Sequence, residues 1–133
     1  MRILEVHETG VSPRVILDKS YNIFEICGNS ILPDTDKFYK PILEWLEDYK
    51  LQPNSKMELV FNLNYYNISS MKHIMYIVYK LKEIQDMGNS VNVVWHYSIY
   101  DDYMQEFGND LAGLYEVDFT FTSYDVFDRK LAC

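Results

Sequence analysis

The segment 57–97 constrains the fold most, because one periodic helix pattern lies between two apolar strand patterns. Residues 57–63 are rich in Leu, Val and Phe, which is typical of a central strand. Apolar residues then recur at intervals of three and four positions as far as Gly88, a common helix stop. Residues 91–97 return to a strand pattern. A strand–helix–strand unit of this kind predicts two parallel strands joined by a right-handed crossover.

The rest of the chain continues this alternation of strands and helices. Residues 14–18 and 23–28 predict a β-hairpin, and residues 116–121 predict a final strand. Helical spacing over 33–49 and over 101–111 predicts two further helices. The order predicts an α/β layer with a mixed sheet of about five strands and about three helices.

Pro41 interrupts the first of these helix patterns. Proline lacks an amide hydrogen and clashes with the carbonyl four residues back. Residues 33–36 carry a helix-start signal, but we expect the regular helix to begin at or just before Lys40, or to kink there.

The composition fits one globular domain. The chain has 133 residues, of which 48% are hydrophobic, and this is enough for a domain with its own core. Residues 1–12 form a weakly patterned lead-in. We expect a single domain over 1–133, with a core at roughly 12–123 and a tail at 124–133.

Charge and segment composition exclude several classes of protein. A net charge of −8 argues against binding to nucleic acid, which requires a basic surface. No apolar run approaches the ~20 residues of a membrane span, and the acidic N-terminal segment does not resemble a secretory signal. Cys27 and Cys133 lie far apart in sequence, which argues against a disulfide framework. We therefore expect a protein of the reducing cytoplasm.

The chain shows no strong signature of catalysis or of a cofactor. His7, His73 and His96 have no ligand-like neighbours, so we expect no metal site, and no glycine-rich phosphate loop is present. We expect His73 to be solvated in the first turn of the second helix and His96 to lie at a sheet edge. An alternative is a small hydrolase using His96 with Asp101 or Asp102, although these two acids also suit the start of the third helix.

Two adjacent hydroxyl side chains, Ser69 and Ser70, follow the central strand at the turn into the second helix. Helix N-terminal amides favour an anion, so a phosphoryl group there would be stabilised and would change the charge of the surface. Helix capping alone would also explain a serine at this turn. A third interpretation is an unmodified scaffold or oligomer subunit, in which the surplus among twelve tyrosines forms the interface.

Two segments resemble the SiaC family of bacterial regulatory phosphoproteins. One is the Asn-x-Ser-Ser-x-Lys sequence of 67–72, and the other is the Gly-x-x-Val-x-Val-x-Trp-x-Tyr sequence of 88–97. The resemblance covers roughly residues 12–123 and implies a fold similar to the STAS domains of anti-sigma-factor antagonists. It also implies a non-enzymatic switch protein without a cofactor. A Ser/Thr kinase would phosphorylate this protein, and a PP2C-type phosphatase would remove the phosphoryl group. The unphosphorylated form would bind and activate a diguanylate cyclase in cyclic di-GMP signalling linked to biofilm.

The chain departs from this family at the acceptor position, where Ile68 replaces the usual threonine. Either Ser69 or Ser70 takes the phosphoryl group, or the protein is an unphosphorylatable, constitutive binding module. Replacing either serine by Asp is expected to weaken partner binding and to leave the fold intact. The expected partner-binding residues are Tyr65, Tyr66, Asn67, Ile68 and Lys72, with Met71 and Met75 in the core.

Overall fold

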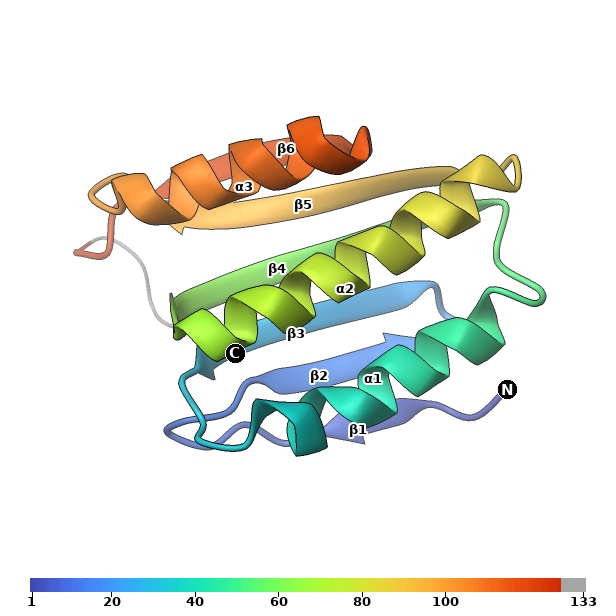
Figure 1. The fold of residues 1–133 in the computed structure, drawn as a ribbon, viewed down its shortest axis with the longest axis horizontal. Helices are drawn as coiled ribbons and strands as arrows, with labels where there is room; N and C mark the ends of the chain where they lie inside the picture. The colour runs from blue at the N-terminus through green and yellow to red at the C-terminus, as the bar shows by residue number, and fades with distance from the viewer. Residues whose placement is uncertain (128–133) are drawn as a thin grey trace.

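The structure is a computed structural model that describes residues 1–127 of the chain. Three helices alternate with strands of one sheet (Figure 1). The elements in chain order are β1 (Leu4–Val6), β2 (Arg14–Asp18), β3 (Ile23–Ser30), α1 (Thr35–Tyr49), β4 (Lys56–Tyr66), α2 (Ile68–Asp86), β5 (Ser90–Ser98), α3 (Asp102–Tyr115) and β6 (Asp118–Tyr124).

The sheet has six strands in the order β1-β2-β3-β4-β5-β6. β1, β2 and β3 are antiparallel neighbours, whereas β3 to β6 are parallel. The strand order advances in one direction through three right-handed crossovers, so all three helices lie on one face (Figure 1). The predicted α/β layer, its three helices and its central parallel unit are confirmed.

The strands are longer and more numerous than the sequence patterns indicate. β1 lies in the expected lead-in, where three residues pair with β2 from Leu4 opposite Leu17 to Val6 opposite Val15. β4 continues through Tyr66 because Tyr65 pairs with Asn29 of β3. The central strand, expected over residues 57–63, therefore extends to Tyr66.

Helix α1 begins at Thr35, and the expected start near Lys40 is wrong. The Asp34 carboxylate caps the helix by accepting the Lys37 amide hydrogen over 3.1 Å, which fixes the start well before Pro41. Pro41 lies inside the helix, where its ring removes a single backbone hydrogen bond.

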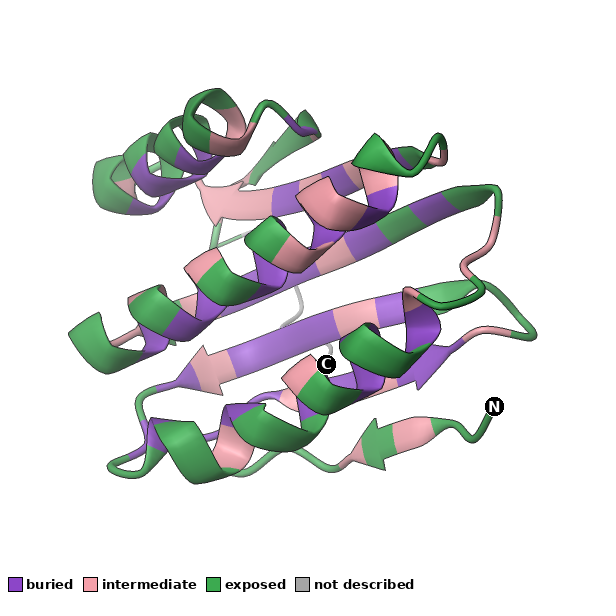
Figure 2. Ribbon diagram, turned by 45° about the vertical axis from the view of Figure 1, so that its right-hand side comes forward, coloured by how far each residue is buried: buried purple, intermediate pink, exposed green. Residues whose placement is uncertain are grey.

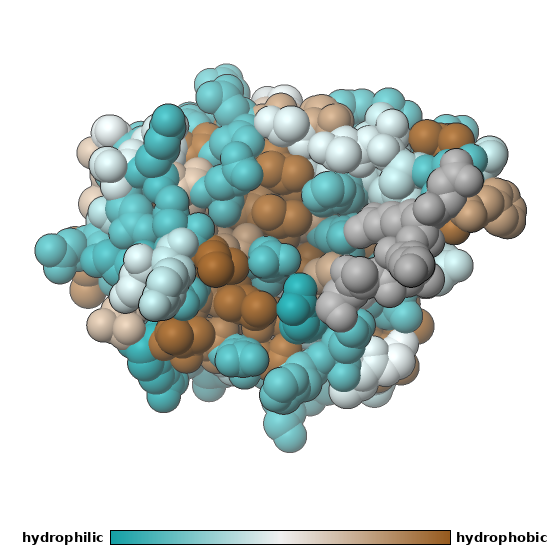
Figure 3. Space-filling model, turned by 180° about the vertical axis from the view of Figure 1, so that it is seen from behind, coloured by the Kyte–Doolittle hydropathy of each residue, from teal (hydrophilic) through white to brown (hydrophobic). Residues whose placement is uncertain are grey.

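The core lies between the sheet and the helices, where the buried apolar residues of β2 to β5 pack against those of the three helices (Figure 2). Trp95 of β5 is fully buried and its indole N–H donates to the Met104 carbonyl of α3 over 2.9 Å. None of the helices within residues 1–127 covers the other face of the sheet. Figure 3 shows an apolar strip at the centre of that face between polar side chains. Val60 and Val94, paired on β4 and β5, are half-buried.

Cys27 is buried in β3. The prediction against a disulfide framework concerns Cys27 and Cys133 together. Cys133 and the rest of the expected tail beyond residue 127 lie outside the described residues. No helix within residues 1–127 is long and apolar enough to span a membrane.

An alternating ion-pair network joins α1 to α2. Lys50 lies 2.8 Å from Glu47 and 3.3 Å from Glu83, and Lys80 lies 2.5 Å and 3.3 Å from the same two carboxylates. Hydrogen bonds from Lys50 and then Lys80 lower the pKa of Glu47 from 4.5 to about 2. Because the pKa is depressed in the folded state, this stabilisation is complete above about pH 4.5 and declines as the pH falls towards 2.

We expect Glu47→Gln to lower the free energy of unfolding at pH 7 by less than about 1 kcal/mol, because the pair is half-exposed and screened by solvent. The difference between the variant and the wild type should shrink as the pH falls below 4.5. Urea unfolding of both proteins at pH 7 and pH 3 measures this difference in the free energy of unfolding. A difference that stays constant across this range would contradict the network.

Candidate partner-binding site

Asn67 organises the turn between β4 and α2. Its side-chain oxygen accepts the Ser70 amide hydrogen over 2.9 Å, and its side-chain nitrogen donates to the Leu32 carbonyl over 3.1 Å. Its backbone is extended, with φ −94° and ψ 171°, as is usual for an N-cap residue. Asn67 is thus the helix cap, and the alternative in which a serine caps α2 is wrong.

Ser70 is buried in a polar network beneath this cap. Its hydroxyl oxygen lies 2.6 Å from Asn67 Oδ1 and 2.8 Å from the Ser30 carbonyl oxygen, and it accepts from Ser30 Oγ over 2.8 Å. Ser30 Oγ is also bonded to the Tyr39 hydroxyl at 2.6 Å. Burial raises the pKa of Tyr39 to about 12, partly opposed by its hydrogen bonds to Ser30 and Ser70. The network holds the Ser70 hydroxyl away from solvent.

Ser69 and Ile68 are exposed on the first turn of α2. The Ser69 hydroxyl donates to Asn67 Oδ1 over 3.1 Å, and the exposed fraction of Ile68 is 85%. Of the two candidate phosphorylation sites, the structure therefore exposes Ser69 and buries Ser70.

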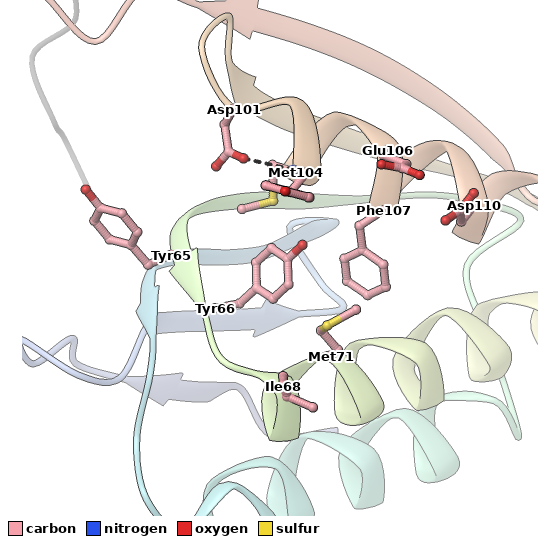
Figure 4. Close-up of a pocket in the computed structure, with 10 residues that line it drawn as sticks. Tyr65, Tyr66, Ile68, Met71, Asp101, Met104, Glu106, Phe107 and Asp110 are labelled. Carbon is pink, nitrogen blue, oxygen red and sulfur yellow. Dashed lines mark hydrogen bonds between the residues drawn. The ribbon is translucent and has the colours of Figure 1, made fainter.

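A groove of about 410 Å³ lies between the start of α2 and α3, next to the end of β4 (Figure 4). Its apolar wall includes Tyr66, Met71, Met104 and Phe107, whose side chains point towards one another. The Tyr66 and Phe107 rings lie 5.2 Å apart. We call this feature the α2–α3 groove; its lining residues are Tyr65, Tyr66, Ile68, Met71, Asp101, Tyr103, Met104, Glu106, Phe107 and Asp110.

The rim of the α2–α3 groove is acidic. Asp101, Glu106 and Asp110 project from the α3 side, and no described lining residue is Lys, Arg or His. Burial raises the pKa of Tyr66, and the negative charges of Asp101 and Glu106 raise it further. The groove therefore combines an apolar floor with a negative potential.

The structure brings three of the expected partner-binding residues to the groove. Tyr65, Tyr66 and Ile68 line it, whereas Asn67 is used as the cap. Lys72 is exposed, with its ammonium group 5.9 Å from the centre of the Tyr76 ring, and it is not part of the groove wall.

The neighbouring residues partly differ from expectation as well. Met71, expected in the core, is half-buried and lines the groove. The sequence patterns did not predict that α3 contributes residues to the groove, because they do not tell which face of α3 adjoins α2. Its signal in the sequence was the mixture of Tyr103, Met104 and Phe107 with acids on one helix.

The histidine expectations require correction. His73 is buried rather than solvated: its Nε2 lies 2.7 Å from Asp36 Oδ1, and its ring stacks on Tyr39 at 5.2 Å between centroids. This follows from the packing of α1 against α2.

His96 lies on β5, between β4 and β6, so it is not at a sheet edge. His96 does not line the groove, and Asp101 is used to cap α3 by accepting the Met104 amide hydrogen over 3.0 Å.

These features define a small α/β protein with an exposed, largely apolar groove at the start of a capped helix. The profile of the SiaC family regulatory phosphoproteins matches residues 6–124, and the chain belongs to this family. An uncharacterized protein of Pseudomonas aeruginosa (strain UCBPP-PA14) is 23% identical over 125 residues, which cover 94% of this chain and 99% of that protein.

Solved structures of similar proteins support the same fold. The chain resembles SiaC of Pseudomonas aeruginosa with a TM-score of 0.80 and 24% identity, covering 93% of this chain and 100% of that one. It also resembles a chain in the crystal structure of the diguanylate cyclase SiaD in complex with its activator SiaC, with a TM-score of 0.82 and 22% identity over 91% of this chain and 99% of that one. The apo-SiaC crystal structure gives a TM-score of 0.73 at 25% identity, covering 92% and 98% of the two chains.

Proposed function

We propose that this chain is a non-catalytic regulator that binds a diguanylate cyclase in the cytoplasm through the α2–α3 groove. The observation that carries the proposal is an apolar groove with Ile68 exposed at its edge, beside the only turn that carries the family's Asn-x-Ser-Ser sequence. Covering an 85% exposed isoleucine with a partner removes apolar surface from water and so favours binding. The SiaC protein that this chain resembles is described as the activator of a diguanylate cyclase.

Binding explains the groove better than hydrolysis does. A hydrolase would need His96 to face a pocket together with Asp101 or Asp102. The groove and the neighbouring pocket at the ends of β4 and β5 have Asp101 on their walls but not His96. The apolar residues that form the floor instead suit the side chains of a protein partner.

We further propose that Ser69 is the modifiable hydroxyl of this chain, phosphorylated by a Ser/Thr kinase and restored by a PP2C-type phosphatase. Its side chain is exposed on the first turn of α2, where helix amides and dipole favour an anion. A hydrated phosphoryl group next to Ile68 would resist the loss of water that partner docking requires. Phosphorylation would thereby release the partner.

A second candidate is a constitutive binding module without a phosphoryl switch. Ile68 favours it, because this exposed apolar residue occupies the position of the family's acceptor threonine and borders the groove. In that case the groove would remain competent for binding under all conditions.

Mass spectrometry of the tryptic peptide 57–72 from native cells separates the two candidates, because Ser69 and Ser70 are its only Ser or Thr residues. We expect a phosphoryl group on Ser69. A phosphoryl group on Ser70 would contradict the burial of that hydroxyl. A peptide that is unmodified under every growth condition would contradict the phosphorylation switch and support the constitutive binding module.

A further inference from the structure

A second pocket of about 550 Å³ adjoins the α2–α3 groove at the ends of β4, β5 and β6. The two hollows share Tyr65, Asp101 and Tyr103 on their walls, so one docked segment can enter both. We call the second one the tyrosine pocket. Its wall includes four tyrosines and two carboxylates, which are Tyr65, Tyr100, Tyr103, Tyr124, Asp101 and Asp102.

The chemistry of the tyrosine pocket favours a cation. No Lys, Arg or His lies among its described lining residues, and the chain as a whole carries a net charge of −8. Tyr65, Tyr100 and Tyr103 are largely exposed, so their ring faces are accessible to a ligand. Cations bind the faces of aromatic rings, and neighbouring carboxylates add to that attraction.

The tyrosine pocket also has a side-chain amide on its wall. Asn29 lines the pocket, and its side-chain oxygen is shielded from solvent with no hydrogen-bond partner among the described residues. Its side-chain nitrogen donates to the Gly10 carbonyl over 3.2 Å, which fixes the orientation of the amide. A ligand that donates several hydrogen bonds would satisfy the carboxylates of Asp101 and Asp102 on the pocket wall.

We propose that the tyrosine pocket receives an arginine side chain of the partner segment that docks in the α2–α3 groove. This rests on the proposed function for the source of the arginine. A guanidinium group is planar, stacks on aromatic rings and offers five donors, whereas the ammonium group of lysine is compact and strongly hydrated. The shared wall requires that this arginine lie close to the apolar side chain that fills the groove.

The test uses N-acetyl-arginine amide as the probe and N-acetyl-citrulline amide as its uncharged counterpart, each titrated into the labelled full-length protein and followed by NMR. We expect saturable shifts at Tyr65, Tyr100 and Tyr103 with the arginine probe and much weaker binding of the citrulline probe. Asp101→Asn with Asp102→Asn should weaken binding about tenfold, since each carboxylate contributes a few-fold at this range. Asn is also an accepted helix cap, so α3 should persist.

Asp110→Asn is the matched control, because Asp110 lines the groove but not the tyrosine pocket. It should leave the affinity for the arginine probe within about twofold. Equal binding of the two probes, no saturable shift, or no effect of the double variant would overturn the proposal. Shifts of the same tyrosines that depend on protein concentration alone would assign the pocket to a second copy of this chain and overturn it too.

No cyclase takes part in this titration, so the two proposals fail separately. If the cyclase binds but the arginine probe does not, the proposal of an arginine in the tyrosine pocket is wrong and the proposed function stands. Probe binding without cyclase binding would keep the cation pocket and remove the proposed partner.

Discussion

The Ser70→Asp variant should lose about 3–5 kcal/mol of stability, in the range found when a buried charge has no partner. The Ser70 hydroxyl is fully buried, and the oxygens of Asn67 and the Ser30 carbonyl lie within 2.8 Å of it. A carboxylate there would face two acceptor oxygens. The free energy of unfolding of a domain of this kind is about 5–15 kcal/mol, so a large share of the variant should unfold under mild denaturant.

Ser69→Asp is the matched control for that experiment. Ser69 is exposed one residue away, and an acidic side chain in the first turn of a helix is favourable. Its midpoint of urea unfolding should stay within the error of the wild type. We therefore expect only one of the two serines to tolerate Asp. Equal unfolding midpoints of the two variants would contradict the buried network.

Gly108→Ala should destabilise the protein by about 1–3 kcal/mol, which is typical of overpacking a core. A Cβ at this position of α3 would lie 2.6 Å from Nε1 and 2.7 Å from Cδ1 of Trp95, and 2.9 Å from the Phe121 ring. Trp95 is fully buried, and its N–H bond to Met104 holds it in place, so α3 itself must shift. Since α3 forms one wall of the groove, this shift should also weaken partner binding.

Gly113→Ala on the same helix provides the control, because no described atom beyond its chain neighbours and the adjacent helix backbone lies within 4 Å of the added Cβ. Here only the helix propensity changes, and alanine should stabilise the protein by up to about 1 kcal/mol. Thermal unfolding of the two variants should therefore give shifts of opposite sign. Shifts of the same sign would show that the close approach of α3 to β5 is wrong.

The sequence predicted the parallel core of the fold well, because residues 57–97 follow the strand and helix periods closely. It missed β1, whose three residues are too few to show a period. The role of Asn67 was also hidden, since Asn and Ser are both good helix caps and only the turn geometry selects between them.

Only one side of the groove carries residues that the sequence suggested for partner binding. Tyr65, Tyr66 and Ile68 are adjacent in sequence and follow directly from the turn. Phe107 and Asp110 reach the same groove from a distant helix, and its orientation depends on tertiary packing. The burial of Ser70 depends likewise on Ser30, forty positions away in the chain.

The most direct test of the account is the affinity of this protein for a diguanylate cyclase encoded in the same genome, measured by titration calorimetry for two variants. Ile68→Asp changes an 85% exposed apolar residue at the groove, and Leu51→Asp changes an 81% exposed one beyond the far end of α1. We predict at least about a tenfold loss of affinity for Ile68→Asp, since a buried isoleucine contributes roughly 1.5–3 kcal/mol. Leu51→Asp should bind as the wild type does. Equal affinities of the two variants would contradict docking at the groove.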